Sequence, residues 1–179
     1  MRNAEEGLVE RVKRERQAFS EVYQRYAPRI YSYIYQRTSS TVEAEELTAA
    51  VFLRALSHLD SYQPQGQSFG TWLFTIAHNL LVNWYRDRER RGPLALREVN
   101  GAEDMAAALA TAEDVVTVQR AVASLPEERQ QLIFLKYVEG LSNAEIGRVM
   151  GRSEGAVKSL LHRTLRALRK EIQRQHNGR

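Results

Sequence analysis

Residues 142–172 read SNAEIGRVMGRSEGAVKSLLHRTLRALRKEI, a stretch that is typical of two helices joined by a tight turn. Ser142 and Glu145 fit a capping box, in which a serine hydroxyl and a glutamate three residues later satisfy amides at the start of a helix. Gly151 is placed to end this helix, and Ser153 is placed to cap a second one after the turn. The stretch therefore predicts a helix-turn-helix.

The second helix of the pair has an apolar side and a basic side, as counted at about 100° per residue. The apolar side holds Val157, Leu160, Leu161, Thr164, Leu165, Leu168 and Ile172. The other side carries Lys158, Ser159, His162, Arg163, Arg166, Arg169 and Lys170. Most charge runs are simply solvated, but a basic side that directly follows a tight turn favours a recognition helix in the major groove of DNA.

The residues on this basic side suit different parts of a DNA duplex. Lys158, Ser159 and Arg163 can bond base edges, whereas Arg166 and the cations beyond it can neutralise phosphates. His162 has no partner at metal-ligand spacing, so it is interpreted as a DNA contact. The predicted duplex-binding set is Arg152, Ser153, Lys158, Ser159, His162, Arg163 and Arg166.

Composition excludes several classes of protein. The 179 residues carry a formal net charge of +4, which favours polyanions as partners, and cysteine is absent, which excludes disulfides and thiolate sites. No apolar run suits a signal peptide or a membrane span, so we expect a soluble cytosolic protein without membrane insertion. The motifs GxxxxGK, GxGxxG and HExxH and clustered histidines are missing, so we expect no enzyme activity, no metal and no other cofactor.

The N-terminal half predicts three amphipathic helices. Apolar residues recur at spacings of three and four over residues 19–34, 42–56 and 69–84, and three such faces can bury one core. Between the second and third helices, residues 60–68 form a polar loop that contains proline, glycine and an exposed tyrosine, Tyr62.

Composition changes after a basic stretch at residues 86–91. Residues 92–117 hold one basic and five acidic residues, which predicts a flexible acidic linker with a short helix at 105–110. Helical periodicity then resumes, and residues 118–179 hold 12 basic and 6 acidic residues. We therefore predict an all-α protein with two small helical domains, residues 1–91 and 118–179, of which the second contains the helix-turn-helix.

The order of several short strings resembles the extracytoplasmic-function (ECF) sigma factors of bacterial RNA polymerase. Region 2 of that family is similar to residues 19–91, through the strings EAEEL at 43–47, FLRA at 52–55 and FGTWLFTIAHN at 69–79. Region 4 is similar to residues 118–170, through LP at 125–126, GLS at 140–142, EI at 145–146 and AVKS at 156–159. Each string alone is weakly specific, but their order and spacing together are strongly specific.

The resemblance implies a transcription initiation factor. Region 2 would dock on the polymerase clamp and hold the unpaired −10 strand, while region 4 would read the −35 duplex. The implied partners are core RNA polymerase, promoter DNA and an anti-sigma factor, and the implied location is the bacterial cytoplasm, at the nucleoid. The residues expected at the polymerase are Glu46, Ala49, Ala50, Leu53 and Arg54.

The resemblance also implies a pocket for one flipped base of the −10 strand. Tyr62 and Asn79 match the family positions that form it, and an aromatic ring with an amide suits an unpaired base. Both residues could instead have ordinary roles, with Tyr62 packed on its own domain and Asn79 facing solvent. The full set expected at −10 DNA is Ser61, Tyr62, Trp72, Asn79, Arg86, Arg88, Arg90 and Arg91.

Three departures from the family pattern affect these expectations. Ala49 and Ala50 stand where the family usually has a glutamine and an acid, which predicts fewer polar contacts to the polymerase. Leu160 stands where an arginine is common, which removes one DNA contact. Gly147 replaces the usual alanine and is expected to loosen the first helix of the helix-turn-helix.

A free-standing helix-turn-helix regulator, which binds duplex DNA without polymerase, is the competing hypothesis. It accounts equally well for the C-terminal half of the chain. It leaves unexplained the aromatic loop, Trp72 and Asn79 ahead of a basic stretch, a combination that suits single-stranded DNA better.

Overall fold

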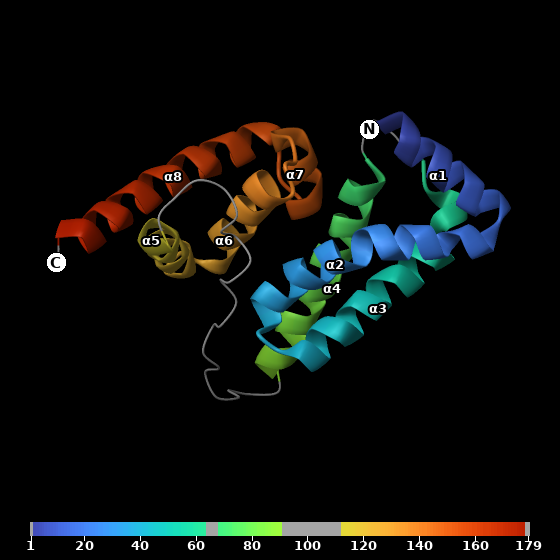
Figure 1. The fold of residues 1–179 in the computed structure, drawn as a ribbon, viewed down its shortest axis with the longest axis horizontal. Coiled ribbons are helices and arrows are strands. Elements are labelled where there is room, and N and C mark those ends of the chain that lie inside the picture. The colour runs from blue at the N-terminus through green and yellow to red at the C-terminus, as the bar shows by residue number, and fades with distance from the viewer. Residues whose placement is uncertain (1, 64–67, 91–111, 178–179) are drawn as a thin grey trace. The chain divides into compact units, whose positions relative to one another are not determined.

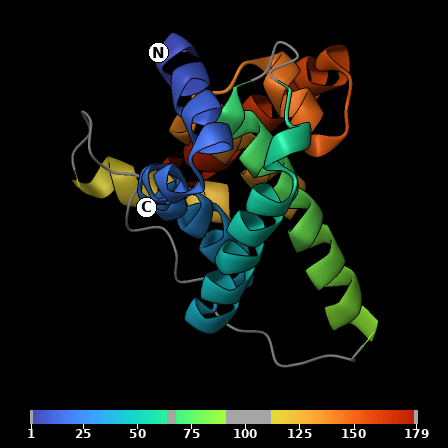
Figure 2. The same cartoon turned by 90° about the vertical axis from the view of Figure 1, so that its right-hand side faces the viewer.

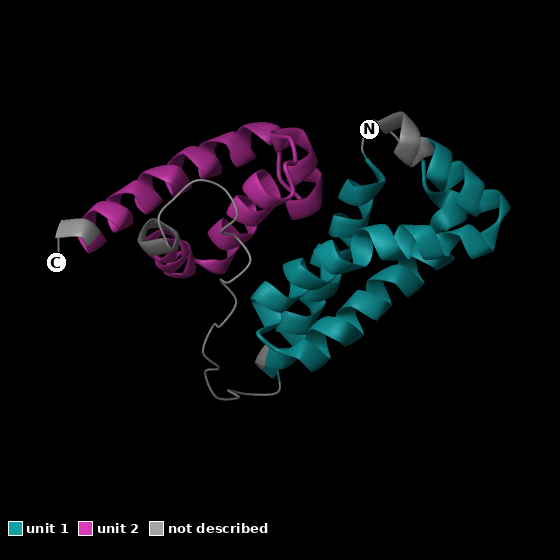
Figure 3. Cartoon of the chain, in the orientation of Figure 1, with its two compact units in different colours: residues 1–98 teal, residues 99–179 magenta. Residues whose placement is uncertain are grey.

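The computed structural model describes residues 2–63, 68–90 and 112–177, and every regular element in these ranges is a helix (Figure 1). This agrees with the all-α prediction. The chain divides into two compact units, residues 1–98 and residues 99–179 (Figure 3). None of the helices in the described ranges has the length and apolar character that a membrane crossing requires.

Three long helices form the centre of the first unit: α2 (Phe19–Thr38), α3 (Thr41–Ser57) and α4 (Phe69–Arg90) (Figures 1 and 2). They pack against one another, and their apolar spacing places one face of each helix in a shared core. Tyr33 and Phe74 meet edge to face, with ring centroids 5.3 Å apart. Further fully buried side chains are Tyr26, Ile30, Ile34, Leu73 and Leu81. The three predicted helices are confirmed.

The connection between α2 and α3 is a tight turn. Ser39 takes the left-handed conformation, with φ of 50°, and the hydroxyl of Ser40 accepts a hydrogen bond from the amide of Glu43 at 3.4 Å. The serine therefore caps α3 in the usual way. At the other end of α3, a 3-10 turn, η2 (Leu59–Ser61), carries the chain toward Tyr62.

No helix is predicted from the sequence before residue 19, yet α1 (Arg2–Arg14) and a 3-10 turn, η1 (Arg16–Ala18), precede α2. Val9 and Val12 are buried, and α1 packs against α4. Only a few apolar residues lie at helical spacing in this charged segment. The helix is therefore stabilised by a tertiary contact that periodicity alone does not reveal.

The described part of the second unit, residues 112–177, contains five helical segments: α5 (Ala112–Ala123), α6 (Glu127–Ile133), a π-helical turn η3 (Phe134–Val138), α7 (Asn143–Met150) and α8 (Glu154–Asn177). The long helix α8 contacts α5, α6 and α7. Ala121, Leu125, Ile133 and Leu168 form one buried cluster, from α5, α6, α8 and the connection between α5 and α6. The apolar side of α8 thus completes the core of this unit.

Helix α5 begins earlier than the sequence predicts. It starts at Ala112, inside the segment 92–117 that is interpreted as the linker. The rest of the linker, the helix expected at 105–110 and Arg91 fall outside the described residues.

The helix-turn-helix has the predicted caps. The hydroxyl of Ser142 accepts from the amide of Glu145 at 3.3 Å, and the amide of Ser142 donates to the carboxylate of Glu145 at 2.9 Å. Gly151 ends α7 with φ of +64°, a conformation that favours glycine. The hydroxyl of Ser153 then accepts from the amide of Ala156 at 3.2 Å, which caps α8.

Gly147 has a packing role that the sequence does not indicate. A β-carbon on Gly147 would lie 2.6 Å from the carbonyl oxygen of Arg152, and the amide of Arg152 donates to the carbonyl of Gly147 at 2.8 Å. The turn therefore passes directly over this residue. Glycine allows the close approach of two backbones that brings α8 against α7.

Candidate nucleic-acid interface

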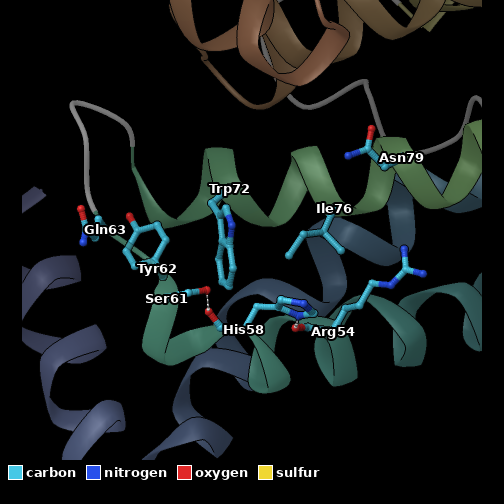
Figure 4. A pocket seen from close by; sticks show the side chains of 8 residues that line it. All are labelled: Arg54, His58, Ser61, Tyr62, Gln63, Trp72, Ile76 and Asn79. Atoms are coloured by element: carbon cyan, nitrogen blue, oxygen red, sulfur yellow. Dashed lines mark hydrogen bonds between the residues drawn. The ribbon is translucent and has the colours of Figure 1, made fainter.

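A pocket of about 640 Å³ lies between the C-terminal part of α3 and the first turns of α4 (Figure 4). Figure 4 shows Trp72 and Ile76 pointing from α4 toward α3, with His58 below them. The volume falls within the range of roughly 300–1,000 Å³ that is usual for small ligands, so a single nucleobase fits. The lining residues are Arg54, His58, Ser61, Tyr62, Gln63, Trp72, Ile76 and Asn79.

Four residues that the sequence assigns to −10 DNA meet at this pocket. Ser61 and Tyr62 come from the segment after α3, and Trp72 and Asn79 come from α4. Trp72 is partly exposed, so one part of its ring remains available to a ligand. Asn79 is exposed, and it lies at the opposite end of the pocket from Tyr62, with Trp72 and Ile76 between them (Figure 4).

Tyr62 is not the exposed loop tyrosine that the sequence predicts. Only 5% of its surface is accessible, and its ring packs edge-on against Phe69 at 5.1 Å and at a tilt against Trp72 at 4.9 Å, measured between centroids. The burial arises because Phe69 and Trp72 bring two aromatic side chains of α4 against the end of η2. Tyr62 therefore supports Trp72 and lines the pocket at the same time.

His58, Gln63 and Ile76 also line the pocket, although none of them is predicted from the sequence. Nδ1 of His58 lies 2.9 Å from the carbonyl oxygen of Arg54. Because a carbonyl only accepts, Nδ1 carries a hydrogen, and Nε2 of the neutral ring remains an acceptor. One signal could have indicated Ile76, since it lies four residues after Trp72 and so shares its helix face.

In the basic stretch at the end of α4, Arg86 and Arg90 are exposed and Arg88 is partly exposed, and all three make contacts within their own helix. Arg86 donates to the side chain of Asn83, and the guanidinium of Arg88 lies 5.0 Å from the centroid of the Trp84 ring. Arg90 lies 4.0 Å from the carboxylate of Asp87. These exposed contacts are weak, so they leave the cations able to meet phosphates.

One exposed side of α3 carries the residues expected at the polymerase. Glu46, Ala49, Leu53 and Arg54 are exposed, and Ala50 is partly exposed. Val42 and Leu53 belong to the three-and-four spacing that assigns them to the core, but both are exposed, and Val42 continues this side toward the start of the helix. Leu53 is 67% exposed and Val42 is 61% exposed, which is unusual for aliphatic side chains. We call Val42, Glu46, Ala49 and Leu53 the α3 stripe, since they recur at helical spacing.

The basic side of α8 is exposed along its length, as predicted. Lys158, Ser159, His162, Arg163 and Arg166 all face solvent, and so do Arg169 and Lys170 further along. At the turn, the guanidinium of Arg152 pairs with the carboxylate of Glu128 on α6. The hydroxyl of Ser153 caps α8. Arg152 is therefore partly committed to a contact inside its own unit.

The apolar side of α8 differs from the prediction at one residue. Leu165 is 41% exposed, so it does not belong to the core. Leu160 is only 6% exposed and is a core residue. A long cation at residue 160 could not stay in the core, so leucine here contributes to packing in the second unit.

Within the part of the chain that the structure describes, no group of three histidine, aspartate or glutamate side chains is placed to hold a metal ion.

Comparisons with known proteins match both halves of the chain. The family model for sigma-70 region 2 matches residues 22–91, and the model for sigma-70 region 4 matches residues 116–168. The chain is 32% identical to the ECF RNA polymerase sigma factor SigW of Bacillus subtilis (strain 168) over 179 residues, which cover 92% of this chain and 94% of SigW. This chain belongs to the ECF sigma factors.

The sigma factor is also 37% identical over 169 residues to the ECF RNA polymerase sigma factor BldN of Streptomyces coelicolor. That match covers 90% of this chain but 63% of BldN, so the chain spans less than two thirds of that relative. The sigma factor RpoE of Bartonella quintana, solved in complex with the anti-sigma factor NepR, shares the fold. Its TM-score is 0.70 at 21% identity, over 87% of this chain and 96% of RpoE.

The matched regions coincide with the two candidate interfaces of this sigma factor. The pocket and the α3 stripe lie within region 2, and the helix-turn-helix with the first turns of α8 lies within region 4. Helix α1 precedes the matched part of region 2.

Proposed function

We propose that this sigma factor binds core RNA polymerase, directs it to specific promoters and helps to open the −10 DNA. The observation that carries the proposal is the meeting of Ser61, Tyr62, Trp72 and Asn79 at one pocket. An unpaired base can stack on Trp72 and bond the amide of Asn79. A protein that reads only duplex DNA has no need of such a pocket.

The pocket also offers groups that can distinguish one base from another. Nε2 of His58 is an acceptor when the ring is neutral, and the amide of Gln63 can both donate and accept. Exocyclic amines and ring carbonyls of a flipped base present the complementary groups. The basic side chains Arg86, Arg88, Arg90 and Arg91 would hold the phosphates of the same strand.

The α3 stripe is the proposed contact with the polymerase. Exposed aliphatic side chains beside charged ones, here Leu53 and Val42 beside Glu46 and Arg54, have the composition of a protein interface. The small side chains of Ala49 and Ala50 allow a partner to approach the helix backbone closely. Apolar packing would therefore replace some of the polar contacts that the family usually makes at these positions.

The second unit is the proposed reader of the −35 element. Lys158, Ser159 and Arg163 lie near the start of α8, which is the end that enters the major groove in a helix-turn-helix. Arg152, Ser153, His162 and Arg166 would contact the flanking backbone and bases. Arg169 and Lys170 would add sequence-independent contacts to phosphates.

The remaining parts of the proposal concern partners and place. An anti-sigma factor, of the kind that RpoE binds in its complex with NepR, would cover an exposed face of this chain and block the polymerase. The sigma factor would have no enzyme activity of its own, because catalysis belongs to the polymerase. It would act in the bacterial cytoplasm, at the nucleoid.

Run-off transcription with purified core polymerase tests the function directly. We expect promoter-dependent transcripts with the wild-type chain and their loss in Asn79→Ala and Leu53→Glu variants. A chain that fails to direct any polymerase transcript, while it binds a duplex site tightly and specifically by itself at physiological salt, would support the free-standing regulator. Weak duplex binding by the chain alone is expected, since its two recognition units are fixed relative to each other only when a partner positions both.

A further inference from the structure

The chain from the end of α3 to Gln63 forms one wall of the pocket, which we call the pocket wall. The N-terminal segment of the chain contacts this wall directly. This segment, residues 2–18, lies outside the range that the region 2 model matches. Two of its cations, Lys13 and Arg16, bond the backbone and side chains of residues 56–62. The contacts join parts of the chain that are forty or more residues apart in sequence.

Lys13 bonds the C-terminal end of the pocket wall, at Tyr62. Its ammonium donates to the carbonyl oxygen of Tyr62 at 2.9 Å and lies 6.0 Å from the centroid of the Tyr62 ring. That carbonyl belongs to the peptide between Tyr62 and Gln63, which are both pocket residues. The lysine side chain is only 23% exposed, so water competes weakly for this bond.

Arg16 bonds the N-terminal part of the pocket wall, at Leu56 and Asp60. Its guanidinium donates to the carbonyl oxygen of Leu56 at 3.1 Å and to the carboxylate of Asp60 at 2.6 Å. Leu56 lies in the last turn of α3, and Asp60 lies in η2. The arginine therefore ties the end of the helix to the turn that carries Ser61 and Tyr62.

The segment itself is anchored independently of these two cations. Val9 and Val12 are buried on one side of α1, and Arg11 pairs with Glu21 on α2. The ammonium of Lys13 also lies 3.5 Å from the carboxylate of Glu10, one turn earlier on the same helix. The position of α1 is thus set by other residues, so Lys13 and Arg16 act on the pocket wall rather than only on α1.

We propose that Lys13 and Arg16 are positioning residues of the base pocket, and that α1 holds the η2 segment in the shape that receives a flipped base. Lys13 acts on the base through Tyr62, which packs against Trp72 at 4.9 Å. Loss of the hydrogen bond from Lys13 to the carbonyl of Tyr62 lets the Tyr62–Trp72 pair shift. A shifted Trp72 ring stacks less well on a flipped base. The inference rests on the proposed function of the pocket.

The test compares Lys13→Met, which removes the ammonium and keeps the stem, with Arg14→Met. Arg14 is exposed on the same helix, and its Nε donates to the carbonyl of Glu10 within that helix at 3.4 Å. Both variants lose one positive charge, so a general loss of DNA attraction affects them alike. With holoenzyme on a matched promoter, we expect Lys13→Met to slow promoter opening about tenfold, whereas Arg14→Met keeps the wild-type rate. Lys13→Arg, which keeps a donor, should recover most of the rate.

A spectroscopic readout reports the pocket without polymerase or DNA. The chain has two tryptophans, so a Trp84→Phe background leaves Trp72 as the sole source of tryptophan fluorescence. In that background, we expect Lys13→Met to increase the quenching of Trp72 by acrylamide, and Arg14→Met to leave it unchanged. Equal opening rates and equal quenching in the two variants would overturn the inference. Absence of promoter-dependent transcripts with the wild-type chain would instead overturn the proposed function, while the quenching result would still report on the positioning of Trp72.

Discussion

The carbonyl oxygen of Arg152 lies 2.6 Å from the point that a β-carbon on Gly147 would occupy. The neighbouring atom belongs to the backbone of the turn, so it cannot move aside as a flexible side chain can. We expect Gly147→Ala to lower the free energy of unfolding of the second unit by about 1–3 kcal/mol, through displacement of the turn. Hydrogen exchange of peptides from α7 and α8, measured by mass spectrometry in the full chain, gives this energy.

Gly155 provides the matched control for this substitution. It lies in the first turn of α8, and a β-carbon there would meet no atom within 4 Å. We expect Gly155→Ala to leave the unit as stable as before or to stabilise it by about 0.5–1 kcal/mol, because alanine favours helix. Equal protection in the two variants would mean that the turn tolerates a side chain over Gly147.

Asn79→Ala should impair promoter opening and leave folding intact, because Asn79 is exposed and its proposed contact is with an unpaired base only. Permanganate reactivity of the −10 thymines should fall, while the closed complex forms with unchanged affinity. If closed-complex affinity falls by the same factor as opening, Asn79 contacts duplex DNA instead.

Tyr62→Ala should act differently, because the ring is buried against Phe69 and Trp72. We expect it to lower the free energy of unfolding of the first unit by about 3 kcal/mol as well as to impair opening. Both tryptophans of the chain, Trp72 and Trp84, lie in α4, so tryptophan fluorescence follows the unfolding of this unit alone. An unchanged unfolding curve would contradict the packing role of Tyr62.

On the recognition helix, reading of bases and binding of phosphates should separate along α8. We expect Lys158→Ala or Arg163→Ala to cost about 1–3 kcal/mol on the preferred −35 sequence and to reduce discrimination among sequences. Arg169→Ala and Lys170→Ala should weaken binding to all sequences alike and reduce the salt slope by about one per lost phosphate contact. Holoenzyme affinity for matched and mismatched −35 elements across a salt series measures both effects. The assignment fails if the Lys158 and Lys170 variants lose discrimination equally.

Leu53→Glu should weaken assembly with core polymerase by about tenfold or more, because it places a charge in an apolar contact. Leu53 is 67% exposed, so unfolding followed by tryptophan fluorescence should be unchanged. Val82→Glu is the matched control, since Val82 is 47% exposed on α4, three residues after Asn79. Without DNA present, Val82→Glu should assemble normally; equal losses would place the polymerase contact outside the α3 stripe.

His78 makes the stability of the first unit depend on pH. Burial lowers the pKa of His78 from its usual value, and the nearby charge of Arg37 lowers this pKa further. The unfolded chain therefore binds the proton at a higher pH than the folded chain does. The contribution to the free energy of unfolding is present above the usual histidine pKa of about 6.5 and is lost as pH falls toward the lowered value. The His78→Gln variant should lose less free energy of unfolding than the wild type between about pH 7.5 and about pH 5.5, as measured by unfolding followed by tryptophan fluorescence. An identical loss in the two proteins would assign the effect to other groups.

Much of the fold follows from local rules that a single sequence carries. The three-and-four spacing predicts α2, α3 and α4, and Ser142 with Glu145 predicts the start of α7. The exposed basic side of α8 follows from the same angular count. These features depend on residues within one or two helical turns of one another, so a window of sequence contains all the information they need.

Other features depend on contacts between distant residues, and no local pattern contains them. Tyr62 follows polar residues in a loop, and only the arrival of Phe69 and Trp72 buries it. Helix α1 has too few apolar residues to be predicted, and it is held by packing against α4. Composition and periodicity determined that this chain is a two-part helical protein with an exposed basic side on one long helix. Only the tertiary structure decided that Lys13 bonds the carbonyl of Tyr62, because a hydrogen bond between residues 49 positions apart exists only once α1 has packed against the rest of the unit.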